Sequence, residues 1–352
     1  MIQTITGNPD YIQQFKNKKA TFMLAMSNTA TAHIAGITQA GIPGMIHLTP
    51  ILDAEFLITG EVRSLPNVAE TPKGVPTPAL ITRGVHLLSP YSHIELLDLG
   101  LEVQPKGDDL NIHHFDIQAS GNITDGANIN AKALFDKGVT FGKTYKYKDD
   151  YLILGESVPS GTTTATATAL ALGYDAKALF SSSFKDVPNN LREETLAKAL
   201  AHVKGKTDLF DILGSVADNM LIFNAGFILG VNSRFPIVLA GGTQMACVLL
   251  VANSISKYMG AEVDSFKLAL CTTKWVAEDE HSDIKALLEM LDFPINAYYA
   301  DFDFSLSEHP ALKLYDEGEA KEGVGAGGAL MFGYLNGLGK EDITRQVEGF
   351  LG

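Results

Sequence analysis

The chain has 352 residues, of which 46% are hydrophobic and 19% charged, and its formal net charge is -14. This length suits one large α/β domain or two smaller ones, and the composition excludes a disordered or fibrous protein. With 27 Lys and Arg against 41 Asp and Glu, the chain lacks the basic face that nucleic acid or an anionic membrane requires, so we expect neither as a partner.

The cysteines and the apolar stretches indicate where the protein resides. Cys247 and Cys271 both lie inside apolar runs, which predicts buried free thiols in a reducing compartment. No basic segment followed by an apolar one opens the sequence, so no signal peptide is expected. The longest apolar stretches, 220–231 and 237–252, are interrupted by glycines and polar residues and are too short for a membrane helix. We therefore expect a cytoplasmic protein.

Short apolar runs that end in small or polar residues alternate with helical patterns along the chain. We predict strands at Ala20 to Met26, Phe56 to Thr59, Ile94 to Leu97, Leu152 to Leu154, Ile237 to Ala240, Phe266 to Cys271 and Ile295 to Ala300. Helical spacing is clearest at Leu196, Leu200 and Val203, and again from Ile284 to Leu291. The alternation predicts an α/β fold with a Rossmann-like, mostly parallel sheet and helices on both faces.

In such sheets the ligand binds outside the carboxyl ends of the strands. Four small polar loops should therefore converge at one edge, namely Ser27-Asn28-Thr29, Gly155 to Thr164, Gly241 to Thr243 and Thr272 to Lys274. Two further loops, Pro66 to Pro78 and Gln104 to Asp109, are placed to reach over that edge.

The loop Gly155 to Thr164 follows a strand and opens a helix of small residues. Main-chain N–H groups at the start of a helix have no intrahelical partners, so this loop can hold a phosphate without a lysine. We expect Glu156 in the same loop to face a hydroxyl, a ribose or a nitrogen. The alternative is an ordinary capped turn between a strand and a helix. The candidate ligand-binding residues of the loop are Gly155, Ser157, Ser160, Gly161, Thr162 and Thr163.

A second turn of the same kind, Gly241-Gly242-Thr243, follows the strand Ile237 to Ala240 and precedes an apolar helix. Together the two turns would clamp one phosphoribose. Alternatively, these glycines only allow the helix to pack closely on the sheet.

Glu322 stands just before a Gly/Ala stretch that includes Gly323 and Gly325 and continues as a helix. An acid partly removed from water by such packing should have a raised pKa, which suits it to proton abstraction. The alternative is a carboxylate favoured at a helix start by the helix dipole.

Other motifs are absent or weak. Residues 278–281 and Asp283 form an acidic loop that we expect to cap a helix rather than bind a metal, and adjacent His113 and His114 should point to opposite faces of a strand. No Walker lysine follows Gly161, and no Rossmann glycine fingerprint with a downstream acid is found. We therefore expect no metal site and no cofactor.

Taken in order, these loops resemble the nicotinate-nucleotide:dimethylbenzimidazole phosphoribosyltransferase family, in particular a divergent, CobT-like branch. The family's Gly-Glu-Met-Gly-Ile-Gly-Asn-Thr-Thr loop aligns with Gly155 to Thr163, and its Gly-Glu-Gly-x-Gly-Ala aligns with Lys321 to Ala326. The resemblance spans roughly Ile94 to Leu335 and places the family's catalytic glutamate on Glu322.

The chain also departs from the family pattern. The Asp-His-Gly-Val segment of the base-binding side has no counterpart, and Ser27 to Ala32 stands in that part of the chain. Gly161 replaces an asparagine and Ala240 an aspartate, so phosphate and ribose contacts are expected to be redistributed, with Lys274 a candidate to supply positive charge.

The resemblance implies an α/β core at 20–304 and a smaller helical part formed by 1–19 and 305–352, which carries the catalytic glutamate loop. It also implies a homodimer. The implied enzyme is a glycosyltransferase of the pentosyltransferase type that moves phosphoribose from nicotinate mononucleotide to 5,6-dimethylbenzimidazole or a similar base. The products would be nicotinate and α-ribazole 5′-phosphate, for cobamide (cobalamin) nucleotide-loop assembly.

In this scheme Glu322 is the general base and Glu156 orients the ribose or the base. Two alternatives remain open at this point. The missing base-side segment favours adenine or another purine as acceptor, and the substitutions at Gly161 and Ala240 favour a nucleotide-binding sensor without turnover.

Overall fold

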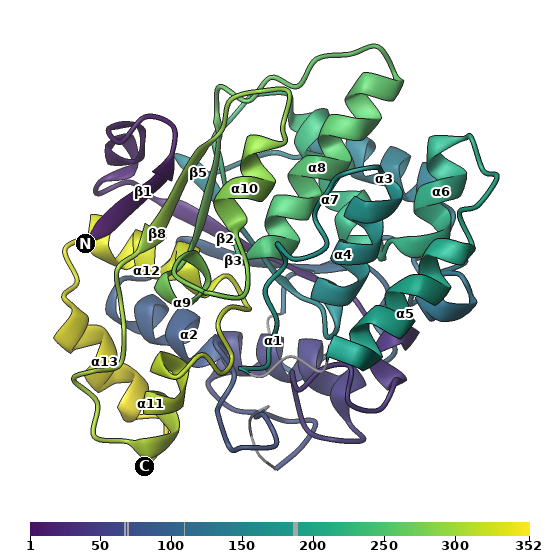
Figure 1. Cartoon of the computed structure of the whole chain (residues 1–352). Coiled ribbons are helices and arrows are strands. Elements are labelled where there is room, and N and C mark those ends of the chain that lie inside the picture. Colours follow the sequence, from purple (N-terminus) through teal and green to yellow (C-terminus); the bar gives the residue numbers. More distant parts are fainter. Residues whose placement is uncertain (67, 69, 109, 186–188) are drawn as a thin grey trace.

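In the computed structural model, which describes residues 1–66, 68, 70–108, 110–185 and 189–352, eight strands form one sheet in the order β1-β8-β7-β6-β5-β2-β3-β4 (Figure 1). Only β1 runs antiparallel to its neighbour among these described strands. Parts of the loops predicted at 66–78 and 104–109 lie outside the described residues. The strands are β1 Ile2–Thr6, β2 Ala20–Met26, β3 His93–Asp98, β4 Ile112–His114, β5 Tyr151–Ser157, β6 Ile237–Ala240, β7 Leu268–Thr273 and β8 Asn296–Ala300.

Helices connect these strands and cover both sides of the sheet. The α-helices are α1 Thr49–Thr59, α2 Ala79–Leu88, α3 Ala131–Thr144, α4 Gly161–Ala171, α5 Asn189–Ala201, α6 Leu209–Val216, α7 Asn219–Val231, α8 Thr243–Tyr258, α9 Lys274–Ala277, α10 Ile284–Glu289, α11 Pro310–Asp316, α12 Ala326–Leu335 and α13 Lys340–Glu348. Short 3-10 helices lie at Tyr11–Phe15, Ala30–His33, Ile46–Leu48 and Ile123–Asp125.

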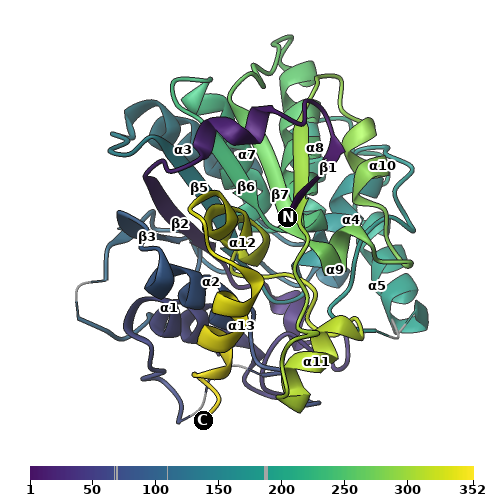
Figure 2. The same cartoon turned by 90° about the vertical axis from the view of Figure 1, so that its left-hand side faces the viewer.

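Strand side chains alternate between two apolar cores, as the pleat requires. On β2, Met23 and Ala25 belong to the core formed with α3, α4, α7, α8 and α10. Phe22 and Leu24 belong to the opposite core, formed with α1, α2, α12 and α13 (Figure 2). The predicted α/β fold with a mostly parallel sheet and helices on both faces is confirmed.

The strand predicted at Phe56 to Thr59 is wrong, because this run ends α1. Residues 49–57 of α1 are all buried, so the helix shows little amphipathic periodicity, and a short apolar run cannot be assigned from periodicity alone. The usual end signals are present: Pro50 lies in the first turn, and Gly60, with φ of 82°, ends the helix in the left-handed region.

The N-terminal segment also differs from the prediction. Residues 1–19 were expected to be helical, but they contain β1 and a single 3-10 helix, and β1 pairs with the edge strand β8. Helices α11, α12 and α13 do follow residue 305. The division into a core at 20–304 and a smaller part from both termini stays a prediction.

Cys247 and Cys271 are buried and unpaired, as predicted. Among the described residues, no helix combines the length and the apolar character needed to cross a membrane.

Candidate active site

The carboxyl ends of β2, β5, β6 and β7 lie side by side, because these strands are parallel neighbours in the sheet. The main-chain N–H of Ser27, just after β2, donates to the carbonyl oxygen of Ser157 at the end of β5. Gly241, just after β6, donates in the same way to Cys271 of β7. The four small polar loops therefore meet at one edge, as the sequence predicts.

Two acidic segments are tied together at this edge. The N–H of Val324 donates to the carbonyl oxygen of Glu156 at 2.9 Å, and a Cβ on Gly155 would lie 3.1 Å from the Cα of Gly325. The absence of side chains at these two glycines lets the loop before α12 rest directly on β5. Glu156 and Glu322 are thereby brought to the same site.

Val324 adopts an uncommon backbone conformation within this loop. Its φ is 53°, in the left-handed region that a β-branched residue rarely enters. Its N–H bonds to Glu156, and its carbonyl oxygen accepts from the hydroxyl of Thr82 at 2.8 Å. Hydrogen bonds on both sides of Val324 thus hold this loop in place.

The carboxylate of Glu322 accepts four hydrogen bonds. One oxygen accepts from the N–H groups of Gly323 (3.2 Å) and Gly327 (3.1 Å). The other accepts from the N–H of Thr273 (2.9 Å) and the hydroxyl of Thr272 (3.2 Å). Burial raises the pKa of Glu322 to about 7, against the pull of these donors. Hydrogen bonds of this kind favour the ionised form.

Glu156 is 3% exposed and has a different environment. Burial, together with the negative charges of Glu322, Asp218 and Asp53, raises its pKa to about 8. Both carboxyls therefore hold a proton more readily than an exposed glutamate does. Two adjacent buried acids with raised pKa values are typical of sites that exchange a proton with a ligand.

Asp53 and Asp218 add two more buried carboxyls that the sequence analysis did not single out. Burial raises the pKa of each to about 6. Asp53, on α1, accepts from the hydroxyls of Thr77 and Ser157, both at 2.7 Å. Asp218 precedes α7 and caps it by accepting from the N–H of Leu221. The sequence signal that could have identified Asp218 is its position just before a helix, where an aspartate commonly caps the first turn.

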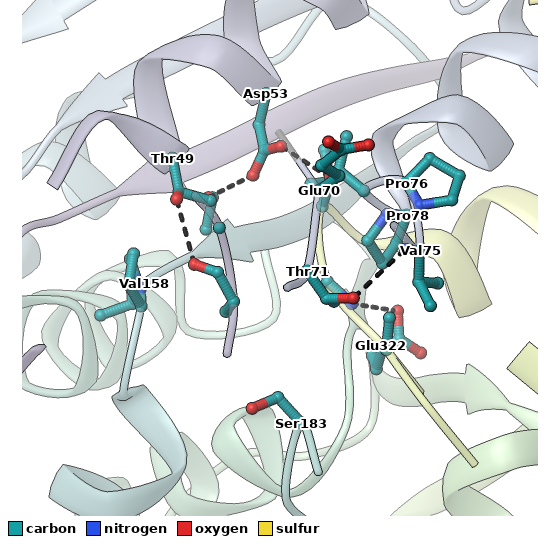
Figure 3. A pocket seen from close by; sticks show the side chains of 18 of the residues that line it. Thr49, Asp53, Glu70, Thr71, Val75, Pro76, Pro78, Val158, Ser183 and Glu322 are labelled. Atoms are coloured by element: carbon teal, nitrogen blue, oxygen red, sulfur yellow. Dashed lines mark hydrogen bonds between the residues drawn. The ribbon is translucent and has the colours of Figure 1, made fainter. Parts of the chain in front are cut away.

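Two adjoining cavities lie over Glu156 and Glu322. The first, of about 590 Å³, has many apolar walls and is closed on one side by the loop 70–78. Figure 3 shows Asp53 entering it from α1, with Ser183 and Glu322 on the opposite side. Its apolar lining includes Val75, Pro76, Pro78, Val158, Pro159 and Val324. The expectation that 66–78 reaches over the site is confirmed for residues 70–71 and 75–78.

The second cavity, of about 510 Å³, is polar. It lies at the start of α4 and α8, and two buried side-chain oxygens in its wall, those of Ser160 and Gln244, have no partner among the described residues. Ser160 has φ of 63°, which is again unusual for a residue other than glycine. A Cβ on Gly161 would meet the Gln244 amide at 1.9 Å. This site therefore offers free polar atoms at two helix N-termini.

The two cavities share a wall formed by Ala40, Glu156, Val158, Ser183, Gln244 and Glu322. The pair of acids thus faces both an apolar and a polar compartment.

Only one of two lysines near the site lines the polar cavity. Lys321 does so, with 5% of its side chain exposed, and pairs with Asp279 at 2.9 Å. Lys274, predicted to supply charge, instead pairs with Asp301 (3.1 Å) and Asp303 (3.6 Å) and lines neither cavity.

Comparisons with known proteins agree with this architecture. The chain is 34% identical over 338 residues to a UPF0284 protein of Sulfurisphaera tokodaii, covering 95% of this chain and 93% of the relative. A UPF0284 protein of Methanothermobacter thermautotrophicus is 33% identical, over 98% of this chain and 96% of its own length. The chain belongs to the UPF0284 family.

No protein-family model matches this UPF0284 protein. Two solved structures share its fold: nicotinate-nucleotide-dimethylbenzimidazole phosphoribosyltransferase of Thermus thermophilus, with a TM-score of 0.60 and 15% identity, and CobT of the same organism, with 0.59 and 16%. Each match covers 98% of this chain, and 92% and 93% of the two neighbours. The resemblance to the CobT-like fold that the loops suggested is confirmed.

Most of the residues predicted for the site line the two cavities of this UPF0284 protein. These are Glu156, Ser157, Ser160, Gly161, Thr162, Gly242, Thr243, Glu322 and Gly323. The others lie outside both cavities and are Ser27, Asn28, Gly155, Thr163, Gly241, Lys274 and Gly325. Asn28 instead links two surface loops, since its side chain donates to the carbonyl oxygen of His47 and accepts from the N–H of Glu102.

The acidic loop and the adjacent histidines behave as the preferred interpretations predict. Asp283 caps α10 by accepting from the N–H of Ala286. His113 is hydrogen-bonded to the carboxylate of Glu95 and His114 to that of Asp98, so the two rings contact different carboxylates.

Proposed function

We propose that this UPF0284 protein transfers phosphoribose from nicotinate mononucleotide to a ring nitrogen of an aromatic base. The observation that carries this proposal is the junction of an apolar and a polar cavity at two buried carboxyls with raised pKa values. The name of the first structural neighbour, a nicotinate-nucleotide-dimethylbenzimidazole phosphoribosyltransferase, supports it.

The polar cavity suits the phosphoribose. The N-termini of α4 and α8 line this cavity and favour a phosphate through their helix dipoles, and Ser160, Gln244 and Thr162 supply polar side chains toward the sugar. Lys321 is the cation at this end, in place of Lys274. Its ion pair with Asp279 at 2.9 Å fixes the ammonium group before a ligand arrives, so little ordering is needed on binding.

The apolar cavity suits the acceptor base. Val158, Val75 and Pro78 provide flat apolar walls for an aromatic ring, and the ring nitrogens would lie toward the shared wall with Glu322. Loop 70–78 excludes water on this side, which preserves the electrostatic effect of the acids.

In the proposed reaction, ionised Glu322 removes the proton from one ring nitrogen while the other nitrogen attacks C1′ of the ribose. The bond from C1′ to the pyridine nitrogen breaks, and nicotinate leaves with the bonding electrons. Attack on the face opposite to the leaving group inverts C1′ and gives an α-riboside 5′-phosphate. Glu156, protonated at neutral pH, donates a hydrogen bond to the ribose or the base.

One feature favours a purine acceptor as the second candidate. The first cavity also presents the carboxyl of Asp53 and the hydroxyls of Thr49 and Thr77. These groups can pair with the exocyclic amine of adenine, whereas dimethylbenzimidazole has no such group.

The test is to incubate the protein with nicotinate mononucleotide and a panel of azole and purine bases, and to follow free nicotinate and riboside phosphate by mass. We expect nicotinate release that depends on the base, and the product mass then names the acceptor. Nucleotide binding by calorimetry without release for any base would overturn the transferase and favour a sensor. The role in cobamide assembly, the homodimer and the cytoplasmic location stay predictions that accompany this proposal.

A further inference from the structure

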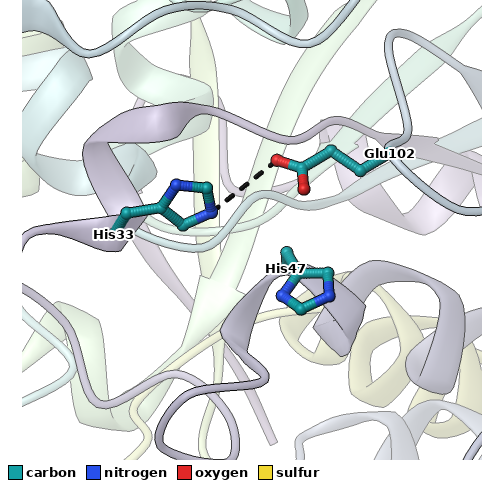
Figure 4. Close-up of side chains that lie close together, drawn as sticks. All are labelled: His33, His47 and Glu102. Atoms are coloured by element: carbon teal, nitrogen blue, oxygen red, sulfur yellow. Dashed lines mark ion pairs between the residues drawn. The ribbon is translucent and has the colours of Figure 1, made fainter.

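A second cluster of potential ligands lies outside both cavities. It contains His33, at the end of a 3-10 helix, His47, in the next 3-10 helix, and Glu102, in the loop after β3. One nitrogen of each imidazole and one carboxylate oxygen of Glu102 all lie within 4.8 Å of one another. Figure 4 shows His33 and Glu102 facing each other, with the ring of His47 close by.

The backbone that carries these ligands is built around one buried side chain. Asn28, 2% exposed, donates to the carbonyl oxygen of His47 at 2.9 Å and accepts from the N–H of Glu102 at 3.0 Å. Thr29, the next residue, caps the 3-10 helix that ends in His33. Three segments far apart in the sequence are therefore fixed relative to one another by consecutive residues after β2.

We propose that His33, His47 and Glu102 bind a divalent transition-metal ion of the zinc type. Two imidazoles and one carboxylate suit such an ion, whereas magnesium and calcium prefer oxygen ligands alone. At metal–ligand distances of about 2.0–2.2 Å, tetrahedral ligand atoms lie roughly 3.3 Å apart. The nitrogen Nε2 of His33 lies 3.8 Å from Oε1 of Glu102, so small side-chain rotations close the site.

The ligand set leaves one coordination position for water or another small ligand. His33 and His47 also line a hollow of about 1090 Å³, together with apolar residues such as Ile34 and Ile46. The open position is therefore accessible from solvent.

The metal would restrict the motion of the segment between the two histidines. Within 34–46, Thr38, Ala40 and Gly41 line the cavities of the candidate active site. A metal held by His33 and His47 joins both ends of this segment to the loop after β3. It would order part of the cavity wall without contacting the acids. The inference rests on this geometry and not on the proposed transfer reaction.

The test is equilibrium dialysis of the metal-free protein against Zn²⁺, with bound metal measured by mass spectrometry, and against Co²⁺, with visible absorption reporting the ligand geometry. We expect one ion per chain. His47→Ala and the conservative Glu102→Gln should each weaken binding about tenfold or more, with unchanged circular dichroism. His281→Ala removes an exposed histidine elsewhere and serves as the matched control.

Glu322→Gln tests whether the acids of the candidate active site contribute to metal binding. This variant should bind the ion as the parent protein does. Absence of stoichiometric zinc in the parent protein, or equal zinc affinity in His47→Ala and Glu102→Gln, would overturn the proposal. Zinc should also slow cleavage within 34–46 by proteinase K. Unchanged cleavage with bound zinc would overturn the role assigned to the segment.

Discussion

The carboxyls of Glu156 and Glu322 form one electrostatic unit, in which burial and the charge of Glu322 together raise the pKa of Glu156 to about 8. Four donors meanwhile oppose the rise at Glu322, whose pKa is about 7. Both pKa values are therefore raised toward neutral pH, and a change at either residue alters the titration of the other.

The first prediction concerns stability and pH. The pKa of Glu156 is about 8 in the fold against an ordinary value of 4.5, so the folded protein keeps a proton that the unfolded chain releases. Stability from this group is complete below about pH 4.5 and is lost as pH rises through 8. Between pH 5 and 8 the free energy of unfolding should therefore fall less steeply in Glu156→Gln than in the parent protein, by up to about 1.4 kcal/mol per pH unit. Denaturant unfolding at several pH values measures this slope.

Glu289→Gln provides the control for this experiment, since Glu289 is exposed on α10 and pairs with Lys285. Its pH profile should match that of the parent protein. If the free energy of unfolding of Glu156→Gln fell with pH as steeply as that of the parent protein, Glu156 would not be the group that holds the proton.

The second prediction concerns turnover. Glu322→Gln should still bind nicotinate mononucleotide but lose nicotinate release by a factor on the order of 100 to 10,000, because a positioned base contributes about that much. Calorimetry measures binding and mass spectrometry measures release. Full activity in this variant would remove Glu322 from the proposed mechanism.

The third prediction distinguishes the two lysines. Lys321→Met should raise the dissociation constant of nicotinate mononucleotide about tenfold or more, because Lys321 lines the polar cavity and bonds to charged groups contribute about 1.5–3 kcal/mol. Lys274→Met should leave it unchanged, since Lys274 pairs with Asp301 and Asp303 outside that cavity.

Lys321→Met also leaves Asp279 buried without its partner, so some loss of stability is expected. Affinity is therefore compared on protein shown to be folded by circular dichroism. A larger effect from Lys274→Met than from Lys321→Met would reverse the assignment.

The fourth prediction concerns the contact between β5 and the loop before α12. Gly325 has φ of 67°, and a Cβ there would lie 3.0 Å from Phe22 and 3.2 Å from both Ala240 and Gly155. Gly325→Ala should lower the free energy of unfolding by about 2–4 kcal/mol, through backbone strain and overpacking. Gly337→Ala, with φ of 87° and no atom within 4 Å, should cost only the backbone term, about 1–2 kcal/mol. Equal losses of stability in the two variants would mean that packing around Gly325 leaves room for a methyl group.

The sequence identified the acids because each stands beside glycines, near the end of a strand or just before a helix. Glu156 and Glu322 were found for that reason. Asp53 was missed because it lies on a helix buried on every side, whose end was mistaken for a strand. Spacing gave no indication that its carboxyl reaches the hydroxyl of Ser157 on β5.

The positions of the two lysines could not be predicted from the sequence for a similar reason. Lys274 directly follows a strand end, which made it a candidate to supply positive charge to the site. In the structure its ammonium group instead forms ion pairs with two aspartates after β8. Lys321 is adjacent to Glu322 in sequence, yet only the three-dimensional structure shows that it faces the polar cavity and is held by Asp279. Such pairings depend on loops whose conformation has no periodic signature.

The pairing of β1 with β8 has a consequence for biosynthesis. Ile2 lies opposite Ala300, so β1 leaves the ribosome long before its partner exists and waits as an unpaired strand. Contacts this distant in sequence slow folding, and an exposed strand is prone to aggregation during the delay. We expect chains stalled before β8 to depend on chaperones until the sheet edge closes.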